Sequence, residues 1–278
     1  MKKKNKKKTL VIMYIILGIS VVGILTFGTW LVVENHLDRQ SQNFYSSILE
    51  GIETRPRSPD NPGDRLPMQS STENGEGSYN AENSEENQNS EWIPFVNFDE
   101  LNVRFPGIIG WIRLEGTPID YPIMQWTDNL FFLSHLPDGT SHRSGSIFMD
   151  FRNEADFSDR NTIVYGHESR TGDMFGTLKY FREQDFYDTN KVIYIYTPER
   201  DYQLIIFAVH LMDSAVEQPR ITFADDEQFA DYLSTVKSRS IISSNVEAEA
   251  DDRIVTLATC AYDFNNARLV VVGKLIPF

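Results

Sequence analysis

The sequence predicts a mainly β domain, folded as a closed or nearly closed barrel, that follows a single membrane-spanning helix. After residue 92 the chain repeats short segments rich in Val, Ile, Tyr and Phe, separated by turn residues. Few helical patterns interrupt these segments, which is typical of a barrel rather than of alternating strands and helices. Residues 9–33 carry no charged side chain, and about 20 apolar residues are enough to cross a bilayer.

The N-terminal segment predicts an uncleaved signal anchor. Residues 1–8, MKKKNKKK, contain six lysines, which favour the cytoplasmic side and leave the rest of the chain outside the cell. A cleaved signal peptide would have a shorter apolar core and a small-residue cleavage site. The apolar run instead ends in Trp30-Leu31-Val32-Val33-Glu34. A buried core helix is the remaining alternative.

Residues 34–91 are expected to join the anchor to the domain. Leu37, Phe44, Ile48 and Ile52 recur on one face of a short amphipathic helix over residues 34–53. Residues 54–91 are rich in Pro, Ser, Asn, Glu and Gly, a composition that cannot bury enough apolar surface to fold. We therefore expect a disordered stalk.

The outer part of the chain is strongly acidic. All 40 acidic residues but only 20 of the 26 basic ones lie beyond Lys8, so its net charge is near −20. This balance argues against a nucleic acid partner, which needs a basic face.

Residues 92–278 are long enough for one domain with a substantial core. A short helix is expected to open at Phe98, with Asp99 as its cap, and to end before Pro106. A second helix is expected within residues 223–239, where Phe229, Tyr232, Leu233 and Val236 follow helical spacing. Strands are expected at residues 111–114, 119–123, 146–149, 162–165, 191–197, 202–212, 254–259 and 269–275.

Cys260 is the single cysteine of the chain. It is either a small buried apolar residue or a reactive thiol. A nucleophilic thiol needs a nearby histidine, and the five candidates are His36, His135, His142, His167 and His210. His167 directly follows a predicted strand and Gly166, a position that presents a side chain from a rigid strand end. His210 lies within a strand and is expected in the core, whereas His135 and His142 flank a turn and are expected in solvent.

Arg268 opens the strand that follows Cys260. If residues 254–259 and 269–275 pair as a hairpin, Cys260 and Arg268 reach the same rim. A guanidinium there would stabilise the oxyanion formed when a thiolate attacks an amide carbonyl. The alternative is a surface ion pair between Arg268 and Asp263, which would contribute little stability.

Several motifs in order resemble those of sortases, and most closely class B sortases of Gram-positive bacteria. TLATC at 256–260 with ARLVVV at 267–272 resembles the TLxTC…R signature, and NTIVYGH at 161–167 resembles the histidine segment. Further likeness lies in FDEL, GWI, PIMQWTDNLFFL, GSIFMD and MFGTLKYF, which begin at residues 98, 110, 122, 145 and 174. The likeness runs from about residue 93 to residue 278.

The resemblance implies a sortase β-barrel of about eight strands, with a helical insertion before the catalytic hairpin and with Cys260, His167 and Arg268 as catalytic residues. It also implies that Asn129, Thr259 and Asp263 contact the substrate. Asn129 could instead be a turn-forming side chain, and Asp263 could instead orient Arg268 or His167 or shape the loop. No cofactor is expected, and no cluster of residues has metal-ligand spacing.

The resemblance further implies a membrane-bound cysteine transpeptidase (a thiol protease type of hydrolase) with its catalytic domain outside the cell. Its partners would be surface proteins with a C-terminal sorting signal, cut after Thr, and an amine acceptor from a cell-wall precursor. Three alternatives stay open on the sequence: a class B sortase that polymerises pilins, a cysteine endopeptidase that uses water, and a non-enzymatic binding module.

Overall fold

The computed structural model describes residues 2–50, 53–56, 92–169, 172–260 and 266–278. The chain divides into two compact units, Met1–Leu49 and Glu50–Phe278. The first unit is one helix, α1 (Lys2–Leu49). Its segment Met13–Leu49 is long and apolar enough to cross a membrane, judged by length and composition alone.

Helix α1 differs from the expected pair of helices because it continues without a break past residue 34. No glycine or proline occurs between Thr29 and Leu49, so no residue there interrupts the hydrogen-bond ladder of the helix. Over residues 34–49 the expected amphipathic helix is therefore the C-terminal part of α1, whereas Ile52 lies outside the described residues and Glu53 belongs to a strand.

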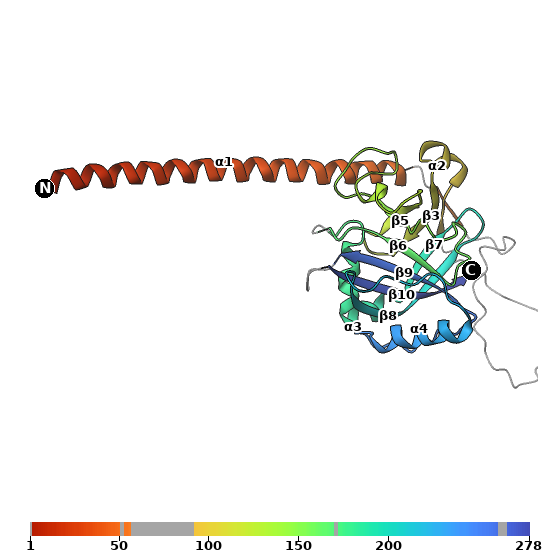
Figure 1. Ribbon diagram of the computed structural model, residues 1–278. Coiled ribbons are helices and arrows are strands. Elements are labelled where there is room, and N and C mark those ends of the chain that lie inside the picture. The colour runs from red at the N-terminus through yellow and green to blue at the C-terminus, as the bar shows by residue number, and fades with distance from the viewer. Residues whose placement is uncertain (1, 51–52, 57–91, 170–171, 261–265) are drawn as a thin grey trace, which may run out of the picture. The chain divides into compact units, whose positions relative to one another are not determined.

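The second unit contains a closed barrel, which confirms the predicted fold class (Figure 1). Within the described residues the strands follow one another around it in the order β10-β8-β7-β3-β4-β5-β6-β9. Their bounds are β3 Ile108–Arg113, β4 Asp120–Met124, β5 Ile147–Met149, β6 Asn161–Tyr165, β7 Val192–Tyr196, β8 Tyr202–Asp213, β9 Arg253–Cys260 and β10 Ala267–Pro277. Each predicted strand is present, with its ends shifted by at most three residues.

Two parallel pairs distinguish this barrel from a simple up-and-down arrangement. β4 pairs with β5 and β6 pairs with β9 in parallel, whereas the other neighbours are antiparallel. In the β6–β9 pair Tyr165 lies opposite Ala258. The C-terminal ends of these two strands therefore meet at one rim of the barrel.

Helix α4 (Asp226–Ser238) covers the outside of the barrel next to β8 (Figure 1). Asp225 caps it, since its carboxylate accepts a hydrogen bond from the Gln228 amide. The helix buries the predicted apolar face with β8, β9 and β10 in one cluster: Phe207, Ala208, Met212, Phe229, Leu233, Val236, Ile254, Val270 and Val272. Because β8 is covered on both faces, residues 206–210 are all buried.

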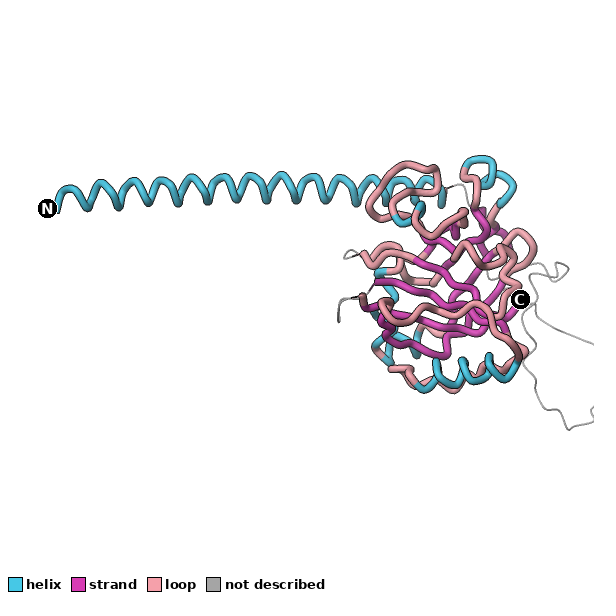
Figure 2. Tube along the Cα trace, in the orientation of Figure 1, coloured by secondary structure: helices cyan, strands magenta, loops and turns pink. Residues whose placement is uncertain are grey.

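The remaining helices lie around the strands (Figure 2). α2 (Phe98–Arg104) is present where expected, but its cap is Asn97, whose side chain accepts a hydrogen bond from the Glu100 amide. The prediction of Asp99 as cap was wrong because Asp99 already lies in the first helical turn. Three helical elements of the described residues were not predicted: η2 (Phe131–Leu133), η3 (Gly176–Arg182) and α3 (Gln184–Thr189).

The first residues of the expected stalk form a strand instead. β1 (Glu53–Pro56) pairs antiparallel with β2 (Trp92–Phe95) in a separate two-stranded sheet. Backbone pairing supplies hydrogen bonds that the polar composition of this segment does not reveal. The rest of the predicted stalk, residues 57–91, lies outside the described residues.

Candidate active site

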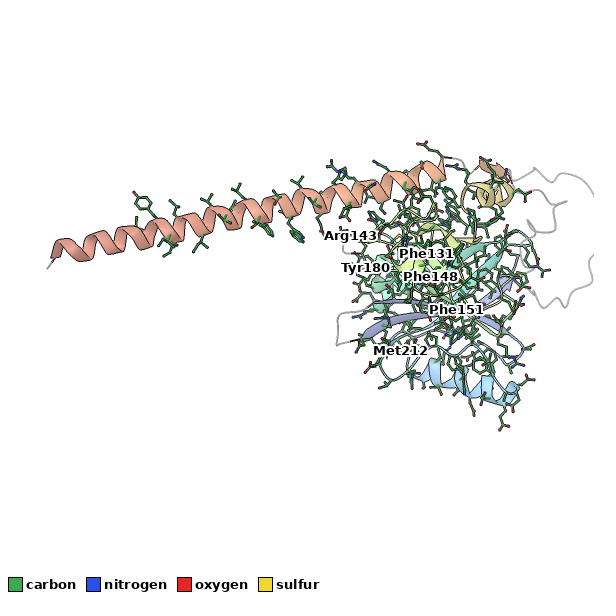
Figure 3. The ribbon with its side chains drawn as sticks, turned by 45° about the horizontal axis from the view of Figure 1, so that its top comes forward. Phe131, Arg143, Phe148, Phe151, Tyr180 and Met212 are labelled. Atoms are coloured by element: carbon green, nitrogen blue, oxygen red, sulfur yellow. The ribbon has the colours of Figure 1, made fainter. Side chains whose placement is uncertain are left out.

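A cleft of about 240 Å³ opens at the rim where β6 and β9 end. Four residues singled out from the sequence contribute to its lining, namely Asn129, His167, Thr259 and Arg268. Phe148 of β5 and Met212 of β8 add apolar side chains (Figure 3). The fold thus brings together residues that are up to 139 positions apart in the sequence.

His167 is held at the end of β6 by hydrogen bonds of the backbone. The Gly166 amide donates to the Ala258 carbonyl at 3.2 Å, which extends the β6–β9 ladder to the residue before the histidine. The His167 carbonyl accepts a hydrogen bond from the Phe175 amide at 3.0 Å. Its ring Nε2 lies 2.7 Å from the Leu133 carbonyl oxygen, and because that oxygen can only accept, Nε2 carries the proton in this contact.

Gly166 is needed because no side chain fits at its position. A Cβ there would lie 2.4 Å from Ile147 Cδ1 and 2.7 Å from the Phe175 ring. The close approach of β5 and the Phe175 ring therefore fixes where the chain leaves β6 and where His167 begins.

The backbones of Cys260 and Arg268 are paired across the predicted hairpin. Cys260 is the last residue of β9, and its backbone pairs in register with Arg268 of β10. Arg268 is half-buried and donates to the Ala267 carbonyl at 3.1 Å. Because Arg268 lines the cleft, the backbone of Cys260 lies at its edge; the side chain of Cys260 is outside what the structure describes.

Asn129 and Thr259 line the cleft in different ways. Asn129 Oδ1 accepts a hydrogen bond from the Phe151 amide at 2.9 Å, so the asparagine is tied to the chain that leaves β5. Thr259 is 2% exposed, and its hydroxyl has no hydrogen-bond partner within the described part of the chain. Asp263, the third expected substrate contact, lies outside the described residues together with its possible ion pair to Arg268.

The other histidines lie outside the lining of the cleft. His210 is buried in β8, as predicted. The expectation for His142 was wrong, because the residue is 5% exposed and its ring Nδ1 lies 2.6 Å from the Ser144 hydroxyl. His135 stacks on Phe131 with the ring centroids 4.2 Å apart. Among the described residues no three His, Cys, Asp or Glu side chains are grouped to hold a metal ion.

Tyr165 is a cleft residue that the sequence reasoning missed. Its hydroxyl donates to Asp150 Oδ2 at 3.1 Å, and burial together with the Asp150 charge raises its pKa well above the ordinary value. The tyrosine therefore stays a hydrogen-bond donor. A signal was available in the sequence, because Tyr165 lies two residues before His167 in the Tyr-Gly-His segment.

Known proteins match this chain over the barrel. The family described as Sortase domain matches residues 112–276. Sortase B of Listeria monocytogenes is 37% identical over 171 residues, which are 61% of this chain and 70% of that protein.

Two solved structures resemble the barrel with a TM-score of 0.62 each. One is a Staphylococcus aureus sortase B–substrate complex, 36% identical, covering 65% of this chain and 84% of that one. The other is a sortase B complexed with triglycine, 37% identical, covering 65% and 85%. The family match, the sequence identity and the shared barrel agree, and the chain therefore belongs to the sortase family and to its class B, the cysteine transpeptidases of surface protein sorting.

Proposed function

We propose that this protein is a membrane-anchored transpeptidase that cuts a C-terminal sorting signal after Thr and transfers the acyl group to an amine. The amine belongs to the peptide of a cell-wall precursor. One observation carries the proposal: a single cleft is lined by His167 and Arg268, with the backbone of Cys260 directly opposite Arg268.

In the first half-reaction the Cys260 thiolate attacks the carbonyl carbon of the threonine. A sulfur–carbon bond forms, and Arg268 stabilises the negative oxygen of the tetrahedral intermediate by charged hydrogen bonds. The carbon–nitrogen bond then breaks while protonated His167 gives its proton to the leaving amine. The product is a thioester on Cys260 and a released C-terminal fragment.

In the second half-reaction the acceptor amine attacks the thioester. Neutral His167 takes a proton from the amine, a new amide bond forms, and the sulfur leaves as a thiolate. Both halves need a histidine that exchanges protons at the cleft, and the position of His167 at a strand end fits this demand.

Support for the substrate and the acceptor comes from the relatives. One similar sortase B is described with a bound substrate and another with triglycine, a peptide that carries a free amine. For this chain the sorting-signal substrate and the amine acceptor rest on those similarities and on the lining of the cleft.

The test is product analysis with the full chain in detergent. We expect a library of sorting-signal peptides, incubated with peptide amines, to give a cleaved and amine-linked product by mass spectrometry. Cys260→Ala should abolish the product. Arg268→Ala should lower kcat/KM by roughly 10²–10³-fold, since one oxyanion donor is lost, and Arg268→Lys, which keeps only the charge, should recover a small part of the rate.

The same products separate the alternatives. A hydrolysed peptide without amine adduct, at any amine concentration, would identify an endopeptidase that uses water. Preference for a lysine side chain of a folded protein as acceptor would identify pilin polymerisation. Full turnover by Cys260→Ala would overturn the mechanism.

A further inference from the structure

A fully buried carboxylate lies behind one wall of the cleft. Asp150 directly follows β5 and its exposed fraction is 0%. Burying a carboxylate costs several kcal/mol unless charged and hydrogen-bonding partners offset the lost hydration. Asp150 therefore needs charged and hydrogen-bonding partners, and it holds those partners in place.

Arg152 supplies the compensating charge. Its Nε donates to Asp150 Oδ1 at 2.9 Å and its Nη2 to Oδ2 at 2.8 Å, a two-point contact, while the Arg152 amide donates to Oδ1 at 3.0 Å. The Arg152 side chain is itself half-exposed. Burial would raise the pKa of Asp150, but these bonds, together with one from Asn129, outweigh burial and lower it.

The remaining capacity of the carboxylate is used by two residues of the cleft. The Tyr165 hydroxyl donates to Oδ2 at 3.1 Å, and the Asn129 side chain acts on the same carboxylate and helps to lower the pKa of Asp150. Asn129 Oδ1 already accepts the Phe151 amide, and a carboxylate only accepts, so the Asn129 amide nitrogen is the donor toward Asp150. Both Asn129 and Tyr165 line the cleft.

The geometry points to Asp150 as a positioning residue for the sorting signal, which fixes the Asn129 amide and the Tyr165 phenol in the cleft wall. This inference rests on the proposed function. Asp150 is not in the lining of the cleft, and His167 and Arg268 are not among its hydrogen-bond partners. Its effect should therefore fall on peptide recognition and leave the chemistry of the thiol unchanged.

Positioning Asn129 and Tyr165 requires the negative charge of Asp150 as well as the shape of its side chain. In Asp150→Asn one oxygen remains, but the other becomes an NH₂ group that donates. Every neighbour that now bonds to the carboxylate is also a donor: the Arg152 guanidinium, the Asn129 amide and the Tyr165 hydroxyl. The Arg152 guanidinium and the Asn129 amide can only donate, so they lose any contact with the new NH₂ group, and the Tyr165 hydroxyl must turn to accept from it. The contacts that hold the two cleft residues therefore change.

The experiment compares Asp150→Asn with Asp159→Asn in the full chain. Asp159 is a matched control from the same connection, where its carboxylate accepts hydrogen bonds from Asn153 and the Glu154 amide and does not line the cleft. We expect Asp150→Asn to raise KM for the sorting peptide about tenfold or more, the loss typical of hydrogen bonds to a charged group. KM for the amine and the rate of Cys260 alkylation should change less than twofold, and Asp159→Asn should leave all three values near those of the unsubstituted protein.

A double-mutant cycle that combines Asp150→Asn with Asn129→Ala tests whether Asp150 changes the peptide KM through Asn129. If Asp150 acts through Asn129, the increase in KM caused by Asp150→Asn should shrink in the Asn129→Ala background. Fully additive effects on KM, or a fall in kcat with KM unchanged, would overturn the inference.

A second variant keeps the carboxylate and covers the case in which Asp150→Asn does not fold. Arg152→Gln removes the charged partner that faces Asp150, leaving Tyr165 as the other titratable neighbour, so the pKa of Asp150 rises. We expect the KM for the peptide, relative to the unsubstituted protein, to increase as the pH is lowered from 7.5 to 5. Parallel profiles of the peptide KM against pH for Arg152→Gln and the unsubstituted protein would contradict the inference. Absence of turnover by the unsubstituted protein with every peptide would overturn the proposed function as well, whereas turnover with these KM effects missing overturns the inference alone.

Discussion

Two histidines of the barrel wall differ in what surrounds their rings. His167 lies at a strand end, lines the cleft and has its Nε2 next to a carbonyl oxygen. His210 lies within β8, is 5% exposed, and its Nδ1 has no hydrogen-bond partner within the described part of the chain. Burial and the Arg239 charge lower the pKa of His210 to about 4, although Glu217 acts in the opposite direction.

This difference predicts that His210 makes the fold sensitive to acid. In the unfolded chain the imidazole binds a proton below its ordinary pKa of 6.5, whereas the folded chain resists protonation until about pH 4. Between these values the unfolded state binds more protons, so stability decreases as the pH falls, by roughly 3 kcal/mol over the whole interval. His210→Leu should flatten this decline, as measured by urea unfolding of the full chain in detergent at pH 7 and pH 4.5. An unchanged decline would show that other groups cause it.

At the scale of elements, the site depends on the parallel pairing of β6 and β9. The two strands carry His167 and Cys260 at ends that meet on one rim, and the antiparallel β9–β10 pair adds Arg268. β5 supports this rim from the other side of β6, because Ile147 and Phe175 leave no space beside Gly166.

Gly166→Ala should therefore displace the end of β6 and the histidine with it. We expect a destabilisation of about 1–3 kcal/mol from overpacking and a fall in kcat/KM of at least tenfold, since small misplacements of reacting groups are costly. Adding Ile147→Val removes the nearest methyl group and should restore part of both losses. Gly139→Ala is the control: its Cβ meets no atom within 4 Å, so backbone strain at its positive φ should lower stability without lowering the activity of the folded enzyme.

The sequence predicted the elements better than it predicted the contacts between them. Alternating or continuous β-rich segments located all eight barrel strands, and the spacing of Phe229, Leu233 and Val236 located α4. The β1–β2 pair was missed because a polar segment gave no local signal for a partner some 40 residues away. Asn129, Asp150 and Tyr165 were not predicted to act as a group. Asn129 was expected at the substrate and Tyr165 lies next to the histidine segment, but only the closure of the barrel brings both of them to Asp150.

At the scale of the whole molecule, the chain combines an apolar helix with an acidic domain. Residues 9–33 carry no charge, the lysines precede them, and every acidic residue follows them. The helix α1 includes this run and has the length and composition of a membrane span. These features predict an anchored enzyme with its N-terminus in the cytoplasm.

The anchor can be tested in cells. The full chain should remain in the membrane fraction after alkaline extraction, and deletion of residues 9–33 should move it to the soluble fraction. Protease added outside cells whose wall has been removed should digest the domain and leave a small N-terminal fragment. A domain that is protected from the protease until the cells are lysed would contradict the predicted orientation.

The parallel β6–β9 pair has a consequence for engineering. Antiparallel neighbours can be joined by a tight turn, but parallel neighbours require a long excursion of the chain, and here that excursion holds β7, β8 and α4. The spacing between His167 and the backbone of Cys260 is set by the ladder and does not depend on the length of the return path. The exposed connection around Glu199, between β7 and β8, does not line the cleft. It could therefore be lengthened, exchanged or fused to another module to retarget the enzyme while its reacting groups keep their separation.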